Sequence, residues 1–489
     1  MTLKDLLKDI PDLRTGSDID VEISGLAYSS KMVQPGFLFA AIRGEKRDGY
    51  EFIGEAISLG ARAILSERPE PPNMKVAWVE VRDSREALAL AAANFYGHPS
   101  LGMKVIGITG TKGKTTLTYL LESILRQAGF KPAVIGTINY RWPGEVIPAQ
   151  RTTPEAPDLQ RMMSKMKSLG MTHCLIEVSS HALDLKRVWG IHFDVAVFTN
   201  LSAEHLDYHA SMEDYFETKK KLFFLNAKKR TAVVNLDDAW GKRLISELPL
   251  TTVSYGLEPA AIVRGQNFRF TENGIKAEVD YPGGTMKICS RLLGKHNFYN
   301  ILAAVAIGLA LDVPAARIKE GIAELKGVPG RLEKIDNNLD LWVFVDYAHT
   351  DIALRSLLDA VRELKPRRIL LVFGAGGDRD KGKRARMGEV AAALADWTFL
   401  TSDNPRSEDP LAILAEIEQG FARSSCRAYS IIPDRREAIE AALAAAKKGD
   451  AVLIAGKGHE NTQIFKDRTI PFDDADVARS TLKALESRT

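Results

Sequence analysis

The segment 107–116, GITGTKGKTT, combines the residue types of a phosphate-binding loop. Gly110 and Gly113 would let backbone amides approach phosphate oxygens, Lys114 can reach β- and γ-phosphates, and the Thr115 hydroxyl can bind Mg²⁺. The common pattern G-x-x-x-x-G-K-[ST] is not met, because position 108 is isoleucine. We interpret the segment as a variant cradle, G-T-x-G-K-T-T. The alternative is a glycine-rich turn that binds nothing.

Such a loop must follow a strand and open a helix. The sequence predicts a strand over 104–109 and a helix over 114–128 on its two sides. Further apolar strands are predicted at 173–178, 194–199 and 231–235, with helical stretches between them. Alternating strands and helices favour a mostly parallel sheet covered on both faces.

Two breaks divide the chain, GHPS at 97–100 and GVPGR at 327–331. Before the first break we expect short strands at 61–65 and 76–81 and a helix near 84–97. After the second we expect a dinucleotide-fold unit with strands at 341–346, 367–373, 396–400 and 450–456. The predicted fold is therefore α/β with three domains, at 1–100, 101–330 and 331–489.

The composition of the 489 residues is that of a globular protein, with 45% hydrophobic and 26% charged residues. Sixty-six basic and 63 acidic residues leave a charge of +3, which gives no reason to expect a nucleic-acid or membrane partner. The three cysteines are far apart, the first residues MTLKDLLKDI lack the apolar core typical of a signal peptide, and no apolar run approaches the length of about 18 residues expected of a membrane span. We expect a cytoplasmic protein that is a monomer.

Two polar residues follow predicted strands and could meet at the phosphate loop. Glu177 ends the strand before VSSHAL, where a carboxylate is well placed for Mg²⁺. His205 follows the next strand in TNLSAEHLDYH. Without further context Glu177 could be a surface strand end, and His205 could be a structural histidine.

Three adjacent lysines, 219–221, lie in the helical pattern 212–224. A run of this kind is usually a solvated face. From the sequence alone we therefore interpret Lys219, like its two neighbours, as part of such a face.

The loop GTKGKTT resembles that of the Mur ligase superfamily, the ADP-forming amide ligases that build the peptidoglycan stem peptide; folylpolyglutamate synthetases share it. The resemblance extends to EVSSHAL, TNLSAEHLDYH, LLGKHNFYN, GVPGRLE and DYAHT, although Asp351 stands where the family usually has proline. It implies that Glu177 and His205 bind catalytic Mg²⁺ together with Thr115, and that Lys219 is carbamylated. The implied ATP-binding residues are Gly110, Thr111, Lys112, Gly113, Lys114, Thr115, Thr116, Asn297, Asn300, Arg331, Asp346 and His349.

The N-terminal stretch 28–61 resembles the uridine-nucleotide-binding domain of the later Mur ligases. Ser29-Ser30-Lys31 replaces the usual D-S-R, so Ser30 keeps the hydroxyl. RTTPE at 151–155 resembles the segment that touches the muramoyl-peptide. The residues implied for this substrate are Ser30, Thr152, Thr153, Ser179 and Arg187.

Three further motifs address the amino acid that is added: GAGGDRDKGKR, TSDNPRSEDP and GKGHE. DNPR is also a good turn before a helix starting near Pro410, but that does not explain Arg406. The motif resembles the specificity segment of ligases that add meso-diaminopimelate, whose second carboxylate a guanidinium can grip with two hydrogen bonds. The residues implied are Arg379, Asp403, Asn404, Pro405, Arg406, Gly456 and Glu460.

The resemblance therefore implies ATP-dependent addition of meso-2,6-diaminopimelate to UDP-N-acetylmuramoyl-L-alanyl-D-glutamate through an acyl phosphate, with Mg²⁺ as cofactor. Three alternatives stay open. The enzyme could add L-lysine, which would leave Arg406 unpaired. It could be a folylpolyglutamate synthetase-like ligase, which should lack the uridine domain and DNPR. It could also be a nucleotide-binding regulator without catalysis.

Overall fold

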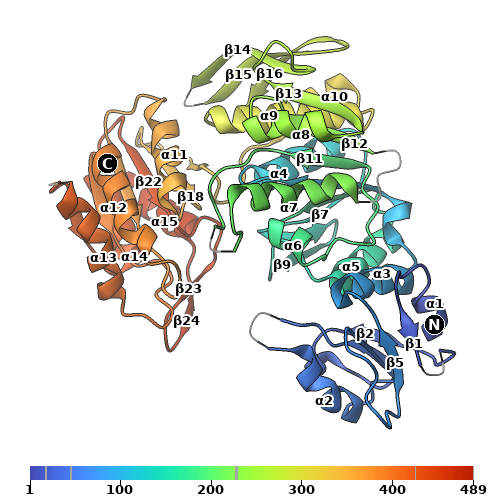
Figure 1. Ribbon diagram of the computed structural model, residues 1–489. Coiled ribbons are helices and arrows are strands. Elements are labelled where there is room, and N and C mark those ends of the chain that lie inside the picture. Colours follow the sequence, from blue (N-terminus) through green and yellow to red (C-terminus); the bar gives the residue numbers. More distant parts are fainter. Residues whose placement is uncertain are drawn as a thin grey trace. The chain divides into compact units, whose positions relative to one another are not determined.

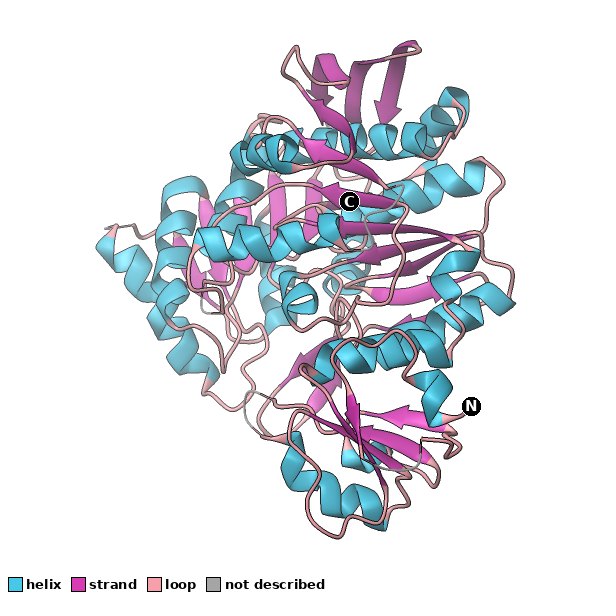
Figure 2. Ribbon diagram, turned by 45° about the vertical axis from the view of Figure 1, so that its right-hand side comes forward, coloured by secondary structure: helices cyan, strands magenta, loops and turns pink. Residues whose placement is uncertain are grey.

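The computed structural model describes residues 1–16, 19–44, 47–206, 208–225, 230–271, 273–424 and 426–487. The chain forms two compact units (Figure 1). Unit 1 holds Met1–Arg264, Asp280–Gly284 and Asn300–Gly321, and unit 2 holds Gly265–Val279, Thr285–Tyr299 and Ile322–Thr489. Helices and strands alternate through most of the sequence, which confirms the predicted α/β class. Figure 2 shows the two kinds of element.

Unit 1 begins with a five-stranded sheet in the order β1-β5-β4-β3-β2. All neighbours pair in parallel except β1 with β5. Helices α1 and α3 contribute to the apolar core on one face, and α2 to that on the other. The elements are α1 (Leu3–Leu6), β1 (Arg14–Thr15), β2 (Gly25–Ala27), β3 (Phe37–Ala40), α2 (Ile53–Ser58), β4 (Ala63–Ser66), β5 (Ala77–Glu80) and α3 (Ser84–Phe95).

The second sheet of unit 1 contains the parallel run β13-β12-β11-β6-β10-β7, followed by the antiparallel edge strands β8 and β9. Its strands are β6 (Lys104–Thr109), β7 (Pro132–Ile135), β8 (Asn139–Trp142), β9 (Glu145–Pro148), β10 (His173–Glu177), β11 (Val195–Phe198), β12 (Thr231–Asn235) and β13 (Thr251–Gly256). The sheet order continues through β14 (Val263–Thr271), β15 (Gly274–Tyr281) and β16 (Gly284–Ser290), which the sequence prediction had missed.

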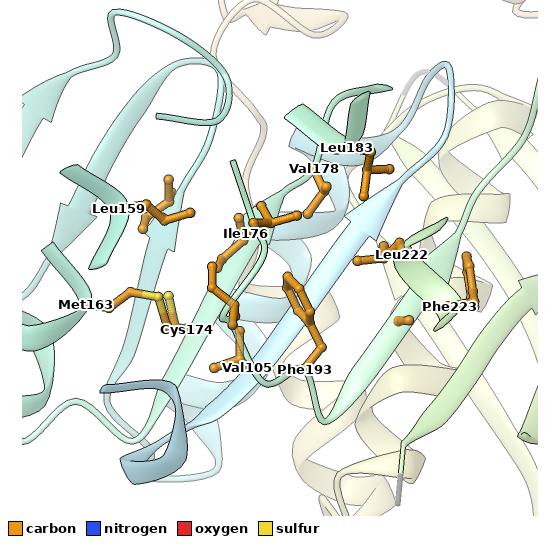
Figure 3. Close-up of a cluster of buried hydrophobic side chains, with 14 of the residues drawn as sticks. Val105, Leu159, Met163, Cys174, Ile176, Val178, Leu183, Phe193, Leu222 and Phe223 are labelled. Atoms are coloured by element: carbon orange, nitrogen blue, oxygen red, sulfur yellow. The ribbon is translucent and has the colours of Figure 1, made fainter. Parts of the chain in front are cut away.

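Seven helices among the described residues accompany this sheet in the sequence. They are α4 (Lys114–Gln127), α5 (Ala156–Ser168), α6 (Ser180–Asp184), α7 (Met212–Phe224), α8 (Ala239–Glu247), α9 (Lys295–Ala310) and α10 (Ala315–Glu324). Helices α5 and α7 pack on one face in a core cluster, where Met163 and Cys174 lie close together and Leu222 lies near Phe193 (Figure 3). The continuous apolar strands are explained by burial on both faces.

The parallel register brings three strand ends to one edge of this sheet. Glu177 of β10 pairs with Ile108 of β6, and Phe198 of β11 pairs with Thr109. The phosphate loop, Glu177 and the segment from Thr199 onward therefore emerge side by side, as expected where ligands bind to parallel sheets.

Unit 2 contains a six-stranded sheet in the order β17-β18-β22-β19-β20-β21, in which only β17 is antiparallel. Its two faces carry separate cores, one with α11, α12 and α13 and the other with α14 and α15. The strands are β17 (Glu333–Ile335), β18 (Trp342–Asp346), β19 (Ile369–Phe373), β20 (Trp397–Leu400), β21 (Tyr429–Ile431) and β22 (Ala451–Ala455), beside the hairpin β23 (Thr462–Ile464) and β24 (Thr469–Pro471). The helices are α11 (Asp351–Arg362), α12 (Gly382–Leu394), α13 (Pro410–Arg423), α14 (Arg435–Ala445) and α15 (Asp474–Glu486).

Candidate active site

The phosphate loop leaves β6 and enters α4 as predicted. Gly110 and Gly113 have φ of +140° and +91°, which side chains rarely adopt. A Cβ on Gly110 would lie 1.9 Å from Thr199 Oγ1, and one on Gly113 would lie 2.4 Å from Asn300 Oδ1. Both positions therefore require glycine. Without β-carbons at these positions, the backbone of the loop stays open to a ligand.

Lys114 folds back over this loop. Its Nζ donates to the carbonyl oxygens of Gly110 at 2.8 Å and Thr111 at 3.0 Å. The loop is also held from β11, because the Lys112 amide donates to Asn200 Oδ1 at 3.0 Å. The lysine is thus positioned over the cradle. Thr115 and Thr116, which follow it, are buried.

Glu177 is the centre of a hydrogen-bond network and is 1% exposed. Its Oε2 accepts from Thr115 Oγ1 at 2.9 Å and from Thr137 Oγ1 at 2.8 Å, while Oε1 accepts from the Thr137 amide at 3.0 Å. The Thr137 hydroxyl in turn lies 3.1 Å from that of Thr152. One carboxylate therefore connects the phosphate loop to the RTTPE segment. Thr137 was not predicted, since no motif marks it.

The RTTPE segment is fixed from the same strand. Thr153 Oγ1 donates to the Glu177 carbonyl at 2.7 Å and accepts from the Ser179 amide at 3.2 Å. Arg187 donates to the Thr153 carbonyl at 3.2 Å and pairs with Glu155 at 2.9 Å. The Arg187 Nε is buried and has no hydrogen-bond acceptor within the described structure. Four of the five residues predicted for the muramoyl substrate are therefore neighbours in the fold.

Ser30 is the fifth residue predicted for the muramoyl substrate, and it lies between β2 and β3 of the five-stranded sheet. It begins the short 3₁₀ helix Ser30–Met32 and is 6% exposed. The adjoining Tyr28 hydroxyl donates to Asp158 of α5 at 2.6 Å. Among the described residues, Ser30 forms no hydrogen bond with the other four.

Lys219 lies on the buried face of α7, whereas Lys221 is exposed. Lys219 is 1% exposed, and its Nζ donates to the Gly110 carbonyl at 3.1 Å and lies 4.5 Å from the Tyr215 ring centre. Burial, reinforced by the charge of Lys114, holds the pKa of Lys219 well below its ordinary value, although Glu204 opposes this. The neutral amine that CO₂ addition needs is therefore favoured. The solvated-face alternative is wrong for this lysine.

His205 is exposed and has φ of +58°. Its ring lies 5.2 Å from that of His181 and 6.2 Å from that of Tyr215. Among the residues that the structure describes, no three His, Cys, Asp or Glu side chains are grouped to hold a metal ion. The oxygens of Thr115 and Glu177 nevertheless are the donors that Mg²⁺ prefers, and Mg²⁺ usually keeps waters and substrate phosphates as its other ligands.

The two asparagines of α9 are both buried, and Asn300 Oδ1 lies against Gly113 of the loop. Asn297 Nδ2 donates to the Leu293 carbonyl at 2.9 Å. In unit 2, Asp346 ends β18 and accepts from the amides of Leu332 at 2.7 Å and Ala348 at 2.8 Å. Asp346 therefore has a structural role, and its role in nucleotide binding stays a prediction.

Arg331 and His349 both lie close to the ring of Tyr347. The Arg331 guanidinium is 4.9 Å from the Tyr347 ring centre, and the His349 ring is 4.6 Å from it. The Arg331 Nε is buried without an acceptor among the described residues. The turn that follows β22 approaches here, since a Cβ on Gly330 would lie 2.2 Å from the His459 amide. Sequence reasoning did not single out His459, whose burial lowers its pKa to about 4.

The DNPR motif and GKGHE form one cluster at the strand ends of unit 2. Asn404 Nδ2 donates to Glu460 Oε2 at 2.7 Å, and a Cβ on Gly456 would lie 2.6 Å from Asp403 Oδ2. Arg406 has φ of +54°, and its Nη1 donates to the Gly377 carbonyl at 2.7 Å. A cavity of about 400 Å³ adjoins this residue and is lined by Pro405, Arg406, Ser407, Glu408, Asp409, Pro410, Phe465, Lys466 and Asp467.

Arg379 differs from the rest of this cluster, because it is exposed and its Nη1 donates a 3.3 Å hydrogen bond to the carbonyl of the neighbouring Asp378. Its loop is tied to Glu408, two residues after DNPR, by Arg384, which is fully buried. Arg384 donates to Glu408 at 2.8 Å and to the Gly376 carbonyl at 3.2 Å. Sequence reasoning missed Arg384, since charged residues are usually predicted at the surface.

Comparison with known proteins agrees with this architecture. Residues 22–96 match the model of the Mur ligase family, catalytic domain, residues 108–308 match the Mur ligase middle domain, and residues 330–458 match the Mur ligase, glutamate ligase domain. A relative from Geobacter metallireducens is 45% identical over 100% of this chain and 99% of its own length. The chain belongs to the Mur ligase family.

Two further similarities support this assignment. A relative from Solibacter usitatus is 47% identical over 94% of each chain, and it carries the same name as the Geobacter protein, UDP-N-acetylmuramoyl-L-alanyl-D-glutamate–2,6-diaminopimelate ligase. A solved structure with that name superposes with a TM-score of 0.73 at 30% identity and covers 99% of both chains. Within the described part of this Mur ligase, no helix is long and apolar enough to cross a membrane.

Proposed function

We propose that this Mur ligase uses ATP to join meso-2,6-diaminopimelate to UDP-N-acetylmuramoyl-L-alanyl-D-glutamate. The observation that carries the proposal is the cluster in unit 2, where Arg406, Asn404 and Glu460 place a cation, an amide and a carboxylate around one site. A substrate head with both a carboxylate and an ammonium matches this set of groups. The full-length relatives named for this reaction support the same substrates.

The reaction has two steps. The free D-glutamate carboxylate attacks the γ-phosphorus of ATP, which forms an acyl phosphate and releases ADP. The amine of diaminopimelate then attacks the acyl carbon, phosphate leaves with the electron pair of the broken C–O bond, and the nitrogen loses a proton. This chain needs to supply positioning and charge stabilisation, and no covalent enzyme intermediate.

The phosphate loop would hold the nucleotide. We assign the backbone of residues 110–113 and Lys114 to the phosphates, Asn297 and Asn300 to the adenine end, and Arg331, Asp346 and His349 to further nucleotide contacts. Bound Mg²⁺ would neutralise charge on the transferring phosphoryl group, with Thr115, Glu177 and His205 as its protein ligands. The burial of Thr115 and Glu177 and the closeness of their side-chain oxygens support this assignment.

We further infer that Lys219 carries a carbamate. Its amine is buried, its pKa is depressed, and it lies at the Gly110 carbonyl next to Lys114. A carbamate would turn this amine into an anion that pairs with Lys114 or a bound metal. Without it, Lys219 would give Lys114 no counter-charge, since its depressed pKa favours the neutral amine.

The muramoyl substrate is assigned to Ser30, Thr152, Thr153, Ser179 and Arg187. The buried, unpaired Nε of Arg187 supports an anionic partner there. Diaminopimelate is assigned to Arg379, Asp403, Asn404, Pro405, Arg406, Gly456 and Glu460. We also propose domain boundaries near residues 100 and 330, a monomeric state and a cytoplasmic location.

The alternatives are less well supported. L-lysine has no distal carboxylate for Arg406. A folylpolyglutamate synthetase-like ligase would not account for the match at residues 22–96 to the Mur ligase family, catalytic domain. A non-catalytic regulator would not require Lys114, Glu177 and Lys219 to converge on one loop.

The deciding experiment measures ADP release with the uridine-linked dipeptide and each amino acid in turn. We expect rapid release with meso-diaminopimelate, little with L-lysine and none without the dipeptide. Glutamate with a folate substrate serves as the control for the polyglutamating alternative. Faster turnover with lysine, or no turnover with any amino acid, would contradict the proposal.

A further inference from the structure

Lys457 is a fully buried lysine whose ammonium lies between two residues of the diaminopimelate cluster. Its side chain is 0% exposed, and Nζ donates to Asn404 Oδ1 at 3.1 Å, Glu460 Oε2 at 3.2 Å and the Thr462 carbonyl at 2.6 Å. The three donors of the ammonium thus have three acceptors. An interior ammonium is costly, so this arrangement calls for a compensating role.

The backbone around Lys457 is shaped to bring the lysine inward. Gly456 and Gly458 on either side have φ of +114° and +54°. A Cβ on Gly456 would lie 2.6 Å from Asp403 Oδ2, and one on Gly458 would lie 2.8 Å from Tyr347 Cβ. The turn after β22 is therefore packed tightly between the loops that follow β20 and β18.

The hydrogen bonds of Lys457 determine which way the Asn404 amide points. Asn404 Oδ1 accepts from Lys457 Nζ at 3.1 Å and from the Ile464 amide at 3.0 Å. Both partners are donors, so the oxygen must face them and Nδ2 must face the other side. There Nδ2 donates to Glu460 Oε2 at 2.7 Å. Rotating the amide by half a turn would place the Nδ2 donor against two other donors, Lys457 Nζ and the Ile464 amide.

The same arrangement commits only one oxygen of Glu460. Oε2 accepts from both Asn404 and Lys457, whereas no described residue donates a hydrogen bond to Oε1. The Glu460 side chain is 32% exposed. Oε2 is thus held by two buried donors of the protein, and Oε1 can accept a hydrogen bond from the ammonium of a ligand.

We propose that Lys457 is a positioning residue for amino-acid selection, which holds Asn404 and Glu460 so that Glu460 Oε1 receives the distal ammonium of the incoming amino acid. The inference rests on the proposed function, because it takes diaminopimelate as the substrate. Lys457 itself does not touch the substrate.

The test uses Lys457→Met and two amines that differ by one group. The first is meso-diaminopimelate; the second is 2-aminopimelate that keeps the reacting amine and both carboxylates but lacks the distal ammonium. The ratio of their kcat/KM values isolates recognition of that ammonium. We expect a wild-type ratio well above 1 and at least a ten-fold smaller ratio in Lys457→Met, with the ATP KM unchanged.

Lys448→Met is the matched control, since Lys448 lies in the same unit and its side chain is 82% exposed. A melting curve checks that each variant is folded. If Lys457→Met does not fold, the ratio is measured on Lys457→Arg, whose planar fork cannot reach the three acceptors from one point and should also lower the ratio.

The outcomes separate the two claims. If wild type releases no ADP with diaminopimelate, the proposed function fails and this inference falls with it. If wild type uses diaminopimelate but the folded variant keeps the ratio within two-fold, or loses both amines equally, only the role of Lys457 is refuted. A variant that loses the preference while keeping 2-aminopimelate turnover supports it.

Discussion

Replacing Arg406 by alanine tests the substrate assignment through a single charge. The Arg406 side chain is only part-buried, and one of its nitrogens already donates to the Gly377 carbonyl. Truncating one partner of a buried charge pair costs about 2–5 kcal/mol. Because Arg406 is not fully desolvated, we expect the lower end, about 2 kcal/mol, which corresponds to roughly a 30-fold loss of kcat/KM for diaminopimelate.

Alanine is the right replacement because of the backbone at this position. Arg406 has φ of +54°, where glycine would relax the chain and change the loop as well as the charge. Alanine keeps the β-carbon, so the cost of the left-handed conformation is nearly the same in both proteins. Arg423→Ala, at a residue 61% exposed and paired with Glu389, is the matched control and should be neutral.

The assay consists of saturation curves for diaminopimelate and L-lysine on wild type, Arg406→Ala and Arg423→Ala. Lysine should gain relative to diaminopimelate in Arg406→Ala, since the unpaired guanidinium that disfavours lysine is gone. The KM values for ATP and the uridine-linked dipeptide should change less than two-fold. The reasoning is wrong if wild type prefers lysine, or if the variant loses both amino acids to the same extent.

Three other outcomes are expected. Lys114→Ala should abolish ADP formation while the melting temperature stays near that of wild type, and near-normal turnover would refute the phosphate-loop assignment. Lys219→Ala should be nearly inactive, and formate or acetate should partly restore its activity by filling the vacated anion site. Lys221→Ala, at an exposed residue of the same helix, is the control and should stay active. A fully active Lys219→Ala would refute the carbamate. Burial lowers the pKa of His173 from 6.5 to about 4, so between these values the unfolded chain binds a proton that the folded chain does not. Stability should therefore fall as the pH drops, by roughly 2 kcal/mol from this group at pH 5, and urea unfolding of His173→Leu should show a weaker pH dependence.

The fold could be predicted where a continuous apolar run is followed by a glycine-containing loop. Strand β6 occupies 104–109 and helix α4 begins at Lys114, as expected, because a buried parallel strand needs a continuous apolar run and the loop between them needs glycine. Strands β15 and β16 were missed, although apolar and polar residues alternate in GIKAEVDY and the turn PGG follows. That period-two pattern was available in the sequence.

The candidate site was predictable only in part. The helical period explains why Lys219 is buried, since it shares a face with Tyr215, Leu222 and Phe223, and this signal could have been found without a relative. No local signal marks Lys457 or Arg384. Each is buried only because carboxylates and carbonyls from segments distant in the sequence converge on it, and such convergence is set by tertiary structure.

The hydrogen bonds of Glu177 have a consequence for how strongly each ligand affects the affinity for the other. This carboxylate holds the Thr115 hydroxyl of the phosphate loop and, through Thr137, the hydroxyl of Thr152. A ligand that withdraws Thr115 from Glu177 changes the acceptor that fixes Thr137 and Thr152. The two substrates assigned to these residues are then thermodynamically linked, and whatever factor the nucleotide applies to dipeptide affinity, the dipeptide must apply to nucleotide affinity.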